Sequence, residues 1–188
     1  PPTLRAKDRP GMIQQLQNRR LIAPSVFSAN LWTNYLADKG KPVSVVYPFA
    51  ENFFRMHPRK KSKASKIRVL YAGRLSPEKG IYTLLAMLHN DLISDQNDEG
   101  YSFTFTATTA GGEKKQGKII KSIVDAHPGI KLVNSRKSPA TMAALMTDSD
   151  IVVMPSNSQY WHETFGIVSI EAQHAGCRVV ASNDGGLP

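Results

Sequence analysis

From Lys66 to the end of the chain, short β-branched segments alternate with longer helical patterns, and this alternation constrains the fold more than any other feature. The β-branched runs are bounded by glycine, proline and polar residues, as strands are, whereas the longer segments place apolar residues at helical spacing. Such an alternation predicts parallel strands joined by right-handed crossovers, and therefore a doubly wound α/β sheet with helices on both faces. We expect strands at 66–73, 101–112, 129–133, 150–156 and 177–182, and helices at 81–93, 115–127, 138–149 and 165–175.

The first third of the chain has the same kind of pattern but too few elements for a sheet of its own. Residues 20–26 and 42–49 are expected to be strands, with a helix between them that is capped by Ser28 and closed by Gly40. One strand-helix-strand unit cannot bury both of its faces. We therefore expect these elements to belong to the end of an N-terminal α/β domain.

The expected domains are residues 1–48, the end of that N-terminal domain; 49–66, a basic linker; and 67–188, a second α/β domain that is incomplete at its C-terminus. The formal net charge is +9, and residues 1–66 hold 13 Lys and Arg against three acidic residues, whereas the remainder holds 11 against 12. The densest basic stretch, residues 55–68, suits a solvated linker or a surface that contacts an anionic membrane. It has no interleaved aromatic residues, so we expect no nucleic-acid partner.

Composition limits the class of protein further. Hydrophobic residues make up 41% of the chain, which suits a globular protein with a real core. The longest apolar runs are too short to cross a bilayer, and the first residues lack the apolar segment of a signal peptide. We expect a cytoplasmic protein, with peripheral contact at the inner face of a membrane through the basic linker. The single cysteine, Cys177, excludes an intramolecular disulfide and a cysteine-rich metal site, and it is expected to be a small buried residue.

Ligands of an open parallel sheet bind beyond the carboxyl ends of the strands, so the loops after the strands are the candidate sites. The first of these loops, GRLSPEKG at residues 73–80, combines a tight exit at Gly73 with the cations Arg74 and Lys79. Two cations beside a helix N-terminus suit a diphosphate. The alternative is a surface loop in which Glu78 and Lys79 form a charge pair.

Three further positions carry weaker signals. The second loop, TTAGGEKK at residues 108–115, contains Gly111 and Gly112, which either allow close approach of a ligand or form an ordinary turn. Residues 134–138 offer polar groups to a nucleobase, or form a plain loop. Asp148 and Asp150 look like an aspartate pair that holds a divalent metal, but they are expected at the amino edge of the sheet, away from ligands, and we do not expect a metal there.

Two glutamates bracket the start of the fourth predicted helix. If the residues between Glu163 and Glu171 are helical, the two lie about 12 Å apart along the axis and about 80° apart around it. Both can then border one crevice at a separation comparable to that between sugar and ribose in a sugar nucleotide. Carboxylates accept hydrogen bonds from paired hydroxyls, and the helix N-terminus attracts phosphate. His162 is expected to be a supporting or surface residue rather than a catalytic one.

Taken in order, these motifs resemble the retaining glycosyltransferases of the GT-B fold, in particular family 4, also called group 1. The motifs are YAGRLSPEKG, VVMPS, HETFGIVSIEAQHAGCRVVAS and GGLP, and the glutamates match the family's E-x7-E signature. The resemblance covers residues 67–188 and, more loosely, residues 19–48. It implies a Rossmann-like, nucleotide-sugar-binding C-terminal domain preceded by the end of an acceptor-side Rossmann-like domain.

The resemblance also implies roles for individual residues. Arg74 and Lys79 would bind the donor diphosphate and stabilise the charge that grows on it during bond cleavage. Glu163 would contact the hydroxyls of the transferred sugar, and Glu171 those of the ribose. The remaining donor-binding positions implied are Gly73, Thr164, Phe165, Gly166 and Ile167, the last three through backbone amides.

The implied activity is transfer of a hexosyl-type sugar from a nucleotide-diphosphate-sugar to a glycan or lipid-linked acceptor, with retention, as in polysaccharide biosynthesis. No cofactor is expected, because cations and amides replace a metal in this family. Two alternatives remain: a sugar-nucleotide epimerase of the same fold, and a non-catalytic module that binds a nucleotide sugar or an anionic surface. The sequence departs from the family pattern at Arg178, where proline is common, and at Trp161 and His162. The fragment alone is expected to be inactive, because most of the acceptor-side domain lies outside it.

Overall fold

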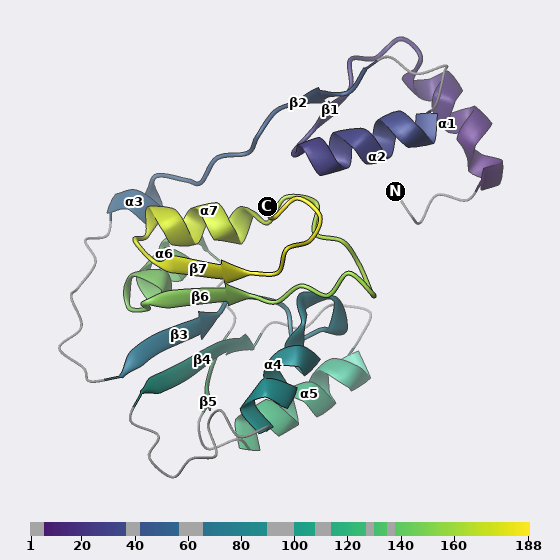
Figure 1. The fold of residues 1–188 in the computed structure, drawn as a ribbon. Helices are drawn as coiled ribbons and strands as arrows, with labels where there is room; N and C mark the ends of the chain where they lie inside the picture. The colour runs from purple at the N-terminus through teal and green to yellow at the C-terminus, as the bar shows by residue number, and fades with distance from the viewer. Residues whose placement is uncertain are drawn as a thin grey trace.

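Five parallel strands form the central sheet in the computed structural model of the chain, which describes residues 6–36, 42–56, 66–89, 100–107, 114–126, 130–134 and 138–188. The strands are β3 (Ile67–Tyr71), β4 (Tyr101–Ala107), β5 (Ile130–Asn134), β6 (Ile151–Met154) and β7 (Arg178–Ala181). Their order across the sheet is β5-β4-β3-β6-β7 (Figure 1). The strand order reverses between β3 and β6, so the carboxyl ends of these two neighbours form the topological switch point at which such sheets bind ligands.

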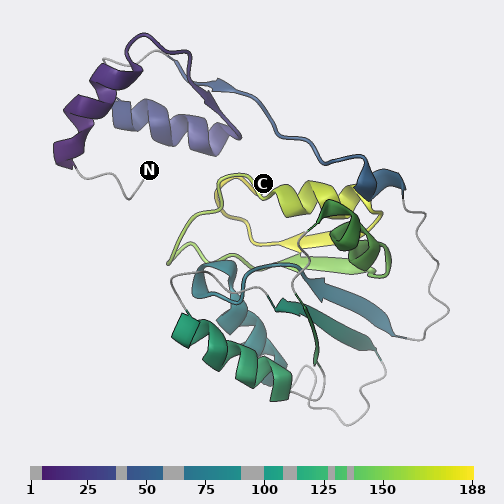
Figure 2. The same ribbon diagram turned by 180° about the vertical axis from the view of Figure 1, so that it is seen from behind.

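Helices cover both faces of this sheet, as predicted. Helices α4 (Ile81–His89) and α5 (Lys114–Ala126) lie on one face, and α3 (Phe53–Met56), α6 (Pro139–Thr147) and α7 (Ile167–His174) lie on the other (Figures 1 and 2). Alternation along β3 explains the two layers, because successive side chains of a strand point to opposite faces. Val69 and Tyr71 belong to the apolar cluster under α4 and α5, whereas Leu70 belongs to the cluster under α6 and α7. The predicted doubly wound α/β fold is therefore confirmed.

A smaller unit precedes the sheet (Figure 1). It contains η1 (Ala6–Asp8), α1 (Arg9–Leu16), β1 (Ile22–Ala23), α2 (Val26–Leu36) and β2 (Ser44–Val45), and its two strands pair in parallel. Both strands are shorter than predicted. The predicted cap at Ser28 is wrong: α2 begins at Val26, and the Ser25 hydroxyl accepts a hydrogen bond of 3.1 Å from the Ser28 amide. Two serines three residues apart both suit a cap, and here the first one is used. Gly40 lies outside the described residues.

The helix boundaries in the larger domain follow the local capping signals. Ser138 caps α6 by accepting a hydrogen bond from the Thr141 amide, with Pro139 as the first helical residue, as predicted. Helix α7, however, begins at Ile167 rather than at residue 165. Gly166 has a φ of 75°, in the left-handed region that favours glycine, so the residues before it cannot continue the helix. Glu163 therefore lies in a loop, not in the first turn of a helix.

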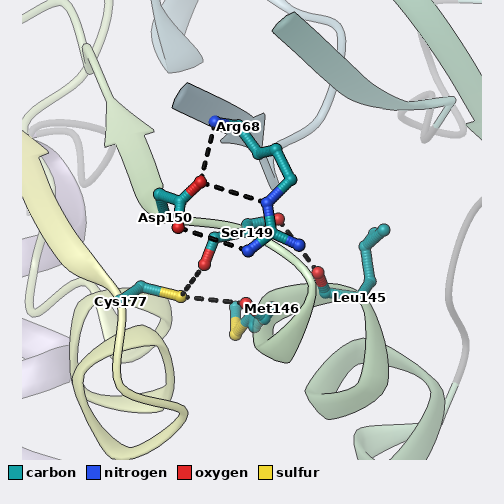
Figure 3. A network of polar contacts seen from close by, with 6 residues as sticks. All are labelled: Arg68, Leu145, Met146, Ser149, Asp150 and Cys177. Carbon is teal, nitrogen blue, oxygen red and sulfur yellow. Dashed lines mark hydrogen bonds and ion pairs between the residues drawn. The ribbon is translucent and has the colours of Figure 1, made fainter. Parts of the chain in front are cut away.

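A polar network closes the amino edge of the sheet (Figure 3). The Asp150 carboxylate accepts hydrogen bonds from the backbone amide of Arg68 at 2.9 Å and from its guanidinium at 3.0 and 3.2 Å, and this hydrogen bonding raises the pKa of Arg68. The buried Cys177 thiol donates to the Met146 carbonyl at 3.0 Å, in agreement with its predicted burial. Asp150 thus serves as the partner of Arg68, on the side of the sheet away from the switch point.

The described residues hold neither a cluster of metal ligands nor a membrane-spanning helix. Within the part of the chain that the structure describes, no three His, Cys, Asp or Glu side chains come together as a metal site would require. Over the same residues, no helix combines the length and the apolar character that a membrane span requires.

Candidate functional site

The loop between β3 and α4 is held in shape by Tyr71, the last residue of β3. The Tyr71 side chain is buried, and its hydroxyl donates a hydrogen bond to the Arg74 carbonyl and lies 3.2 Å from the Lys79 carbonyl. The hydroxyl of an ordinary tyrosine is already protonated at neutral pH, and burial raises the pKa of this one further. A Cβ atom at Gly73 would stand 2.9 Å from the Tyr71 ring, which explains why the strand exits through glycine. Tyr71 thus sets the positions of Arg74 and Lys79 through their backbone.

The far end of the same loop packs on the loop that follows β6. Residues Pro77–Lys79 form the 3-10 helix η3, which ends at Gly80 with a φ of 72°. A side chain at Gly80 would overlap the Pro155 carbonyl. The Asn157 amide also donates to the Glu78 carbonyl at 3.1 Å. The loop after β3 and the loop after β6 are therefore in direct contact, because β3 and β6 are neighbours in the sheet.

An ion pair joins these two loops at their centre. The Lys79 ammonium donates to the Glu163 carboxylate, and the side chains of both residues are largely buried. The Ser156 hydroxyl lies 3.4 Å from the same carboxylate oxygen. Two of the predicted site residues, 84 positions apart in the sequence, are thus brought together.

Arg74 has a different partner. Its guanidinium forms an ion pair of 2.9 Å with Glu78, four residues farther along the same loop. The side chain is 44% exposed, so it can reach a ligand at the mouth of the loop. The charge pair considered from the sequence, Glu78 with Lys79, does not form; each cation instead pairs with a different glutamate. Both cations therefore lie at the switch point, and each is paired with a carboxylate.

Glu171 lies on α7, one turn after Val168, and is half-buried. Burial raises the pKa of its carboxyl group, and the nearby Glu51 carboxylate raises it further. Because Glu163 precedes the helix, the separation of about 12 Å expected for a continuous helix does not apply to the two glutamates. A carboxylate that is desolvated beside another negative charge is stabilised by added hydrogen-bond donors.

A cavity of about 240 Å³ lies at the switch point. Its lining residues come from the end of β3, the loop after it, and the facing elements β4, β6, α6 and α7. They include Gly73, Arg74, Lys79, Thr106, Ser156 and Val168. Both cations therefore border the cavity, and Glu163 contacts two of its lining residues, Lys79 and Ser156. Glu171 is not a lining residue and lies one turn beyond Val168 on α7.

Three consecutive residues around Glu163 are tied to other segments. The imidazole Nδ1 of His162 lies 2.6 Å from an Asp184 carboxylate oxygen. The Glu163 carbonyl accepts a hydrogen bond of 2.7 Å from the Gly186 amide. The Thr164 carbonyl accepts one of 2.5 Å from the Ser25 hydroxyl, which belongs to the smaller N-terminal unit. His162 is thus held by Asp184 on the exposed side of this loop.

The other predicted positions divide into described and undescribed residues. Thr164, Phe165, Gly166 and Ile167 lead from the Glu163 loop into α7, and the Phe165 ring lies 6.3 Å from that of Tyr47. The positions outside the described residues are Gly111, Gly112, residues 135–137 and the centre of the basic linker at 57–65.

Four residues that shape the site are not among those predicted from the sequence: Tyr71, Ser156, Ser25 and Asp184. Tyr71 carries a detectable signal, a polar group at the end of an apolar strand, and Ser25 is a second cap candidate. Ser156 and Asp184 carry no local signal, because their contacts with Glu163, seven residues away, and with His162, 22 residues away, depend on how the loops fold together.

Comparisons with known proteins agree with this architecture. Residues 52–188 match the sequence profile of the family described as Glycosyl transferases group 1. The D-inositol 3-phosphate glycosyltransferase of Streptomyces avermitilis is 32% identical over 185 residues, which cover 90% of this chain and 38% of that protein. The chain therefore spans about two fifths of the length of this relative.

Two solved structures share the fold. Anabaena Alr3699/HepE in complex with UDP-glucose aligns with a TM-score of 0.75 and 23% identity, over 99% of this chain and 51% of HepE. A trehalose-6-phosphate synthase studied for glycosyltransfer with retention aligns with a TM-score of 0.65 and 13% identity, over 96% of this chain and 50% of the synthase. The fold is that of the GT-B glycosyltransferases, and by its profile match over more than half of its length the chain belongs to the group 1 glycosyltransferase family.

Proposed function

We propose that this chain is the donor-binding part of an enzyme that transfers a sugar from a nucleotide-diphosphate-sugar to a glycan or lipid-linked acceptor, with retention of anomeric configuration. The observation that carries the proposal is the Lys79–Glu163 ion pair at the switch-point cavity. A cation and a carboxylate side by side suit a ligand that has a diphosphate directly bonded to a sugar. Alr3699/HepE, which has the same fold, was solved in complex with UDP-glucose, and this supports the choice of ligand.

Donor binding would exchange the ion pair for two new interactions. The diphosphate would accept hydrogen bonds from the Lys79 ammonium and the exposed Arg74 guanidinium. The sugar hydroxyls would donate hydrogen bonds to the Glu163 carboxylate. Because Tyr71 and Gly80 fix the backbone of the cationic loop, its charges need little reorganisation. A preorganised positive field stabilises the charge that develops on the leaving diphosphate.

Glu171 would bind the ribose end of the donor. Its carboxylate is desolvated and lies near a second negative charge, so hydroxyl donors from a ribose would compensate part of that cost. The nucleotide would then extend from the cavity mouth along α7, with the phosphates between the two glutamates.

The transfer step proceeds on one face of the sugar. The bond between the anomeric carbon and the diphosphate oxygen breaks, the acceptor oxygen bonds to the same carbon from the same face, and the acceptor proton passes to the leaving phosphate. Arg74 and Lys79 supply the positive charge that a metal would otherwise provide, so the reaction is proposed to need no metal. The trehalose-6-phosphate synthase, studied for glycosyltransfer with retention, has the same fold and supports this stereochemistry.

A donor screen and a transfer assay test the proposal. The protein containing this chain is titrated with UDP-, GDP- and ADP-sugars in a thermal-shift assay, because a bound ligand raises the melting temperature by mass action. The donor that binds is then offered with a lipid-linked or glycan acceptor, and the anomer of the product is read by NMR, with and without EDTA.

Retained configuration and unchanged rate in EDTA support the proposal. Donor binding without transfer would indicate a sensor, interconversion of the donor alone would indicate an epimerase, and an inverted product would exclude the retaining mechanism.

A further inference from the structure

The smaller N-terminal unit touches the proposed donor site at one backbone atom. The carbonyl of Thr164, the residue directly after Glu163, accepts hydrogen bonds from the hydroxyls of Ser25 at 2.5 Å and Ser28 at 3.2 Å. Both serines are buried and lie in the first turn of α2 or directly before it. Gly186 packs against the Ser25 hydroxyl, because a Cβ atom at Gly186 would stand 2.9 Å from the Ser25 hydroxyl oxygen.

Ser25 uses its hydroxyl in two ways at once. Its oxygen accepts from the Ser28 amide and so caps α2, while its proton goes to the Thr164 carbonyl. A hydroxyl can do both, because it has one donor and two acceptor sites. The start of α2 is therefore hydrogen-bonded to the loop that carries Glu163.

We propose that Ser25, assisted by Ser28, is a positioning residue that orients the Glu163 carboxylate from the N-terminal unit. This inference rests on the proposed function. On the donor-domain side, Glu163 is already held by the Gly186 amide at its carbonyl and by Lys79 at its side chain. The Ser25 bond adds the restraint that crosses from one unit to the other, so the sugar-binding geometry depends on how α2 docks.

The inferred effect is confined to the sugar end of the donor. The nucleotide end is proposed to bind Glu171 on α7, whose carboxyl group lies near Glu51, whereas the Ser25 and Ser28 hydroxyls bond to the loop before α7. Loss of the Ser25 bond should therefore change affinity for a sugar nucleotide but not for the nucleoside diphosphate. A general loss of structure would weaken both.

The test compares paired ligands in the protein that contains this chain. Dissociation constants for UDP and UDP-glucose, GDP and GDP-mannose, and ADP and ADP-glucose are measured by calorimetry. The variants are Ser25→Ala, Ser25→Thr, Ser28→Ala and Ser149→Ala. Ser28→Ala removes one donor to Thr164 but keeps the α2 cap, since that cap uses the Ser28 backbone amide. Ser149→Ala is the matched control, because it removes a hydrogen bond of 2.9 Å from a buried serine hydroxyl to the Leu145 carbonyl at the amino edge of the sheet, away from the Glu163 loop.

For the donor pair that binds the wild type, Ser25→Ala should weaken sugar-nucleotide affinity by about 3- to 10-fold, as for one neutral hydrogen bond, with nucleoside diphosphate affinity unchanged. Ser28→Ala should shift it in the same direction by less, and Ser25→Thr should restore it. Ser149→Ala should lower the melting temperature as Ser25→Ala does and leave both affinities unchanged. Equal losses for both ligands, or none, in Ser25→Ala would overturn the inference. A wild type that binds none of the six ligands would overturn the proposed function, which is a different result.

Discussion

Lys79 and Glu163 form an ion pair across the switch point of the sheet, although 84 positions separate them in the sequence. Each comes from a loop at the carboxyl end of a neighbouring strand, β3 and β6. The pair places a cation and a carboxylate at one cavity. The carboxylate is the group proposed to accept hydrogen bonds from the hydroxyls of the transferred sugar. Removing the negative charge alone tests the role of this pair.

Replacing Glu163 by glutamine should separate binding of the nucleotide from binding of the sugar. The substitution removes the negative partner of Lys79, so the ammonium becomes more available to a diphosphate. We expect affinity for the nucleoside diphosphate to stay equal or rise, while kcat for transfer falls by about 10²-fold or more, as when one preorganised polar group is removed. Calorimetry and initial rates check the two effects. A variant with wild-type kcat would contradict the assignment of Glu163.

Arg74 and Glu78 allow a matched pair of substitutions on one loop. Arg74→Ala should weaken nucleoside diphosphate binding by about 10-fold or more, because a hydrogen bond to a charged group contributes about 1.5–3 kcal/mol. Glu78→Gln breaks the same ion pair from the other side and leaves the guanidinium free. We expect it to bind the nucleotide at least as tightly as the wild type. Both should change unfolding stability by under about 1 kcal/mol, because the pair is partly exposed. Equal losses of affinity in the two variants would show that the pair, not the cation, matters.

Glu171 should make the fold less stable as pH rises. Its pKa is raised by burial and by Glu51, so the folded state keeps a proton in a pH range where the unfolded chain has released it. Stability therefore falls as pH increases from the ordinary carboxyl pKa to the raised one. Glu171→Gln removes this penalty and should melt at a higher temperature than the wild type at about pH 7.5. The advantage should disappear below roughly pH 4, where both forms are neutral.

Two further measurements identify the cause of that shift. Glu51→Gln removes the second, smaller contribution and should give part of the same gain in melting temperature. Nucleotide affinity should fall in Glu171→Gln, because the Glu171 carboxylate is proposed to accept hydrogen bonds from the ribose hydroxyls. Glu51→Gln should leave nucleotide affinity unchanged. A melting temperature that rises with pH in the wild type relative to Glu171→Gln would contradict the sign of the shift.

Asp150 should matter for stability and not for donor binding. Asp150→Asn weakens three hydrogen bonds from Arg68 at the amino edge of the sheet and should lower the free energy of unfolding by about 1–3 kcal/mol in urea titrations (Figure 3). Asp148→Asn is the control, since the Asp148 side chain is exposed and should change stability by less than about 0.5 kcal/mol. Reduced nucleotide affinity in Asp150→Asn at equal folded fraction would count against a purely structural role.

The sequence by itself determined the alternation of strands and helices, the two-faced sheet and the cationic loop after β3. These features depend on periodicity, on β-branched runs and on glycine at special turns, which are local properties. The burial of Cys177 and the cap at Ser138 could be predicted for the same reason.

Tertiary structure decided which charges meet. Local spacing favoured a Glu78–Lys79 pair and a helix that starts near Glu163, yet the left-handed Gly166 delays the helix, and the neighbouring strands β3 and β6 bring Lys79 to Glu163 instead. It also decided that Ser25, not Ser28, caps α2 while its hydroxyl binds Thr164. Such contacts depend on strand order and on the docking of separate segments, and short stretches of sequence do not encode those.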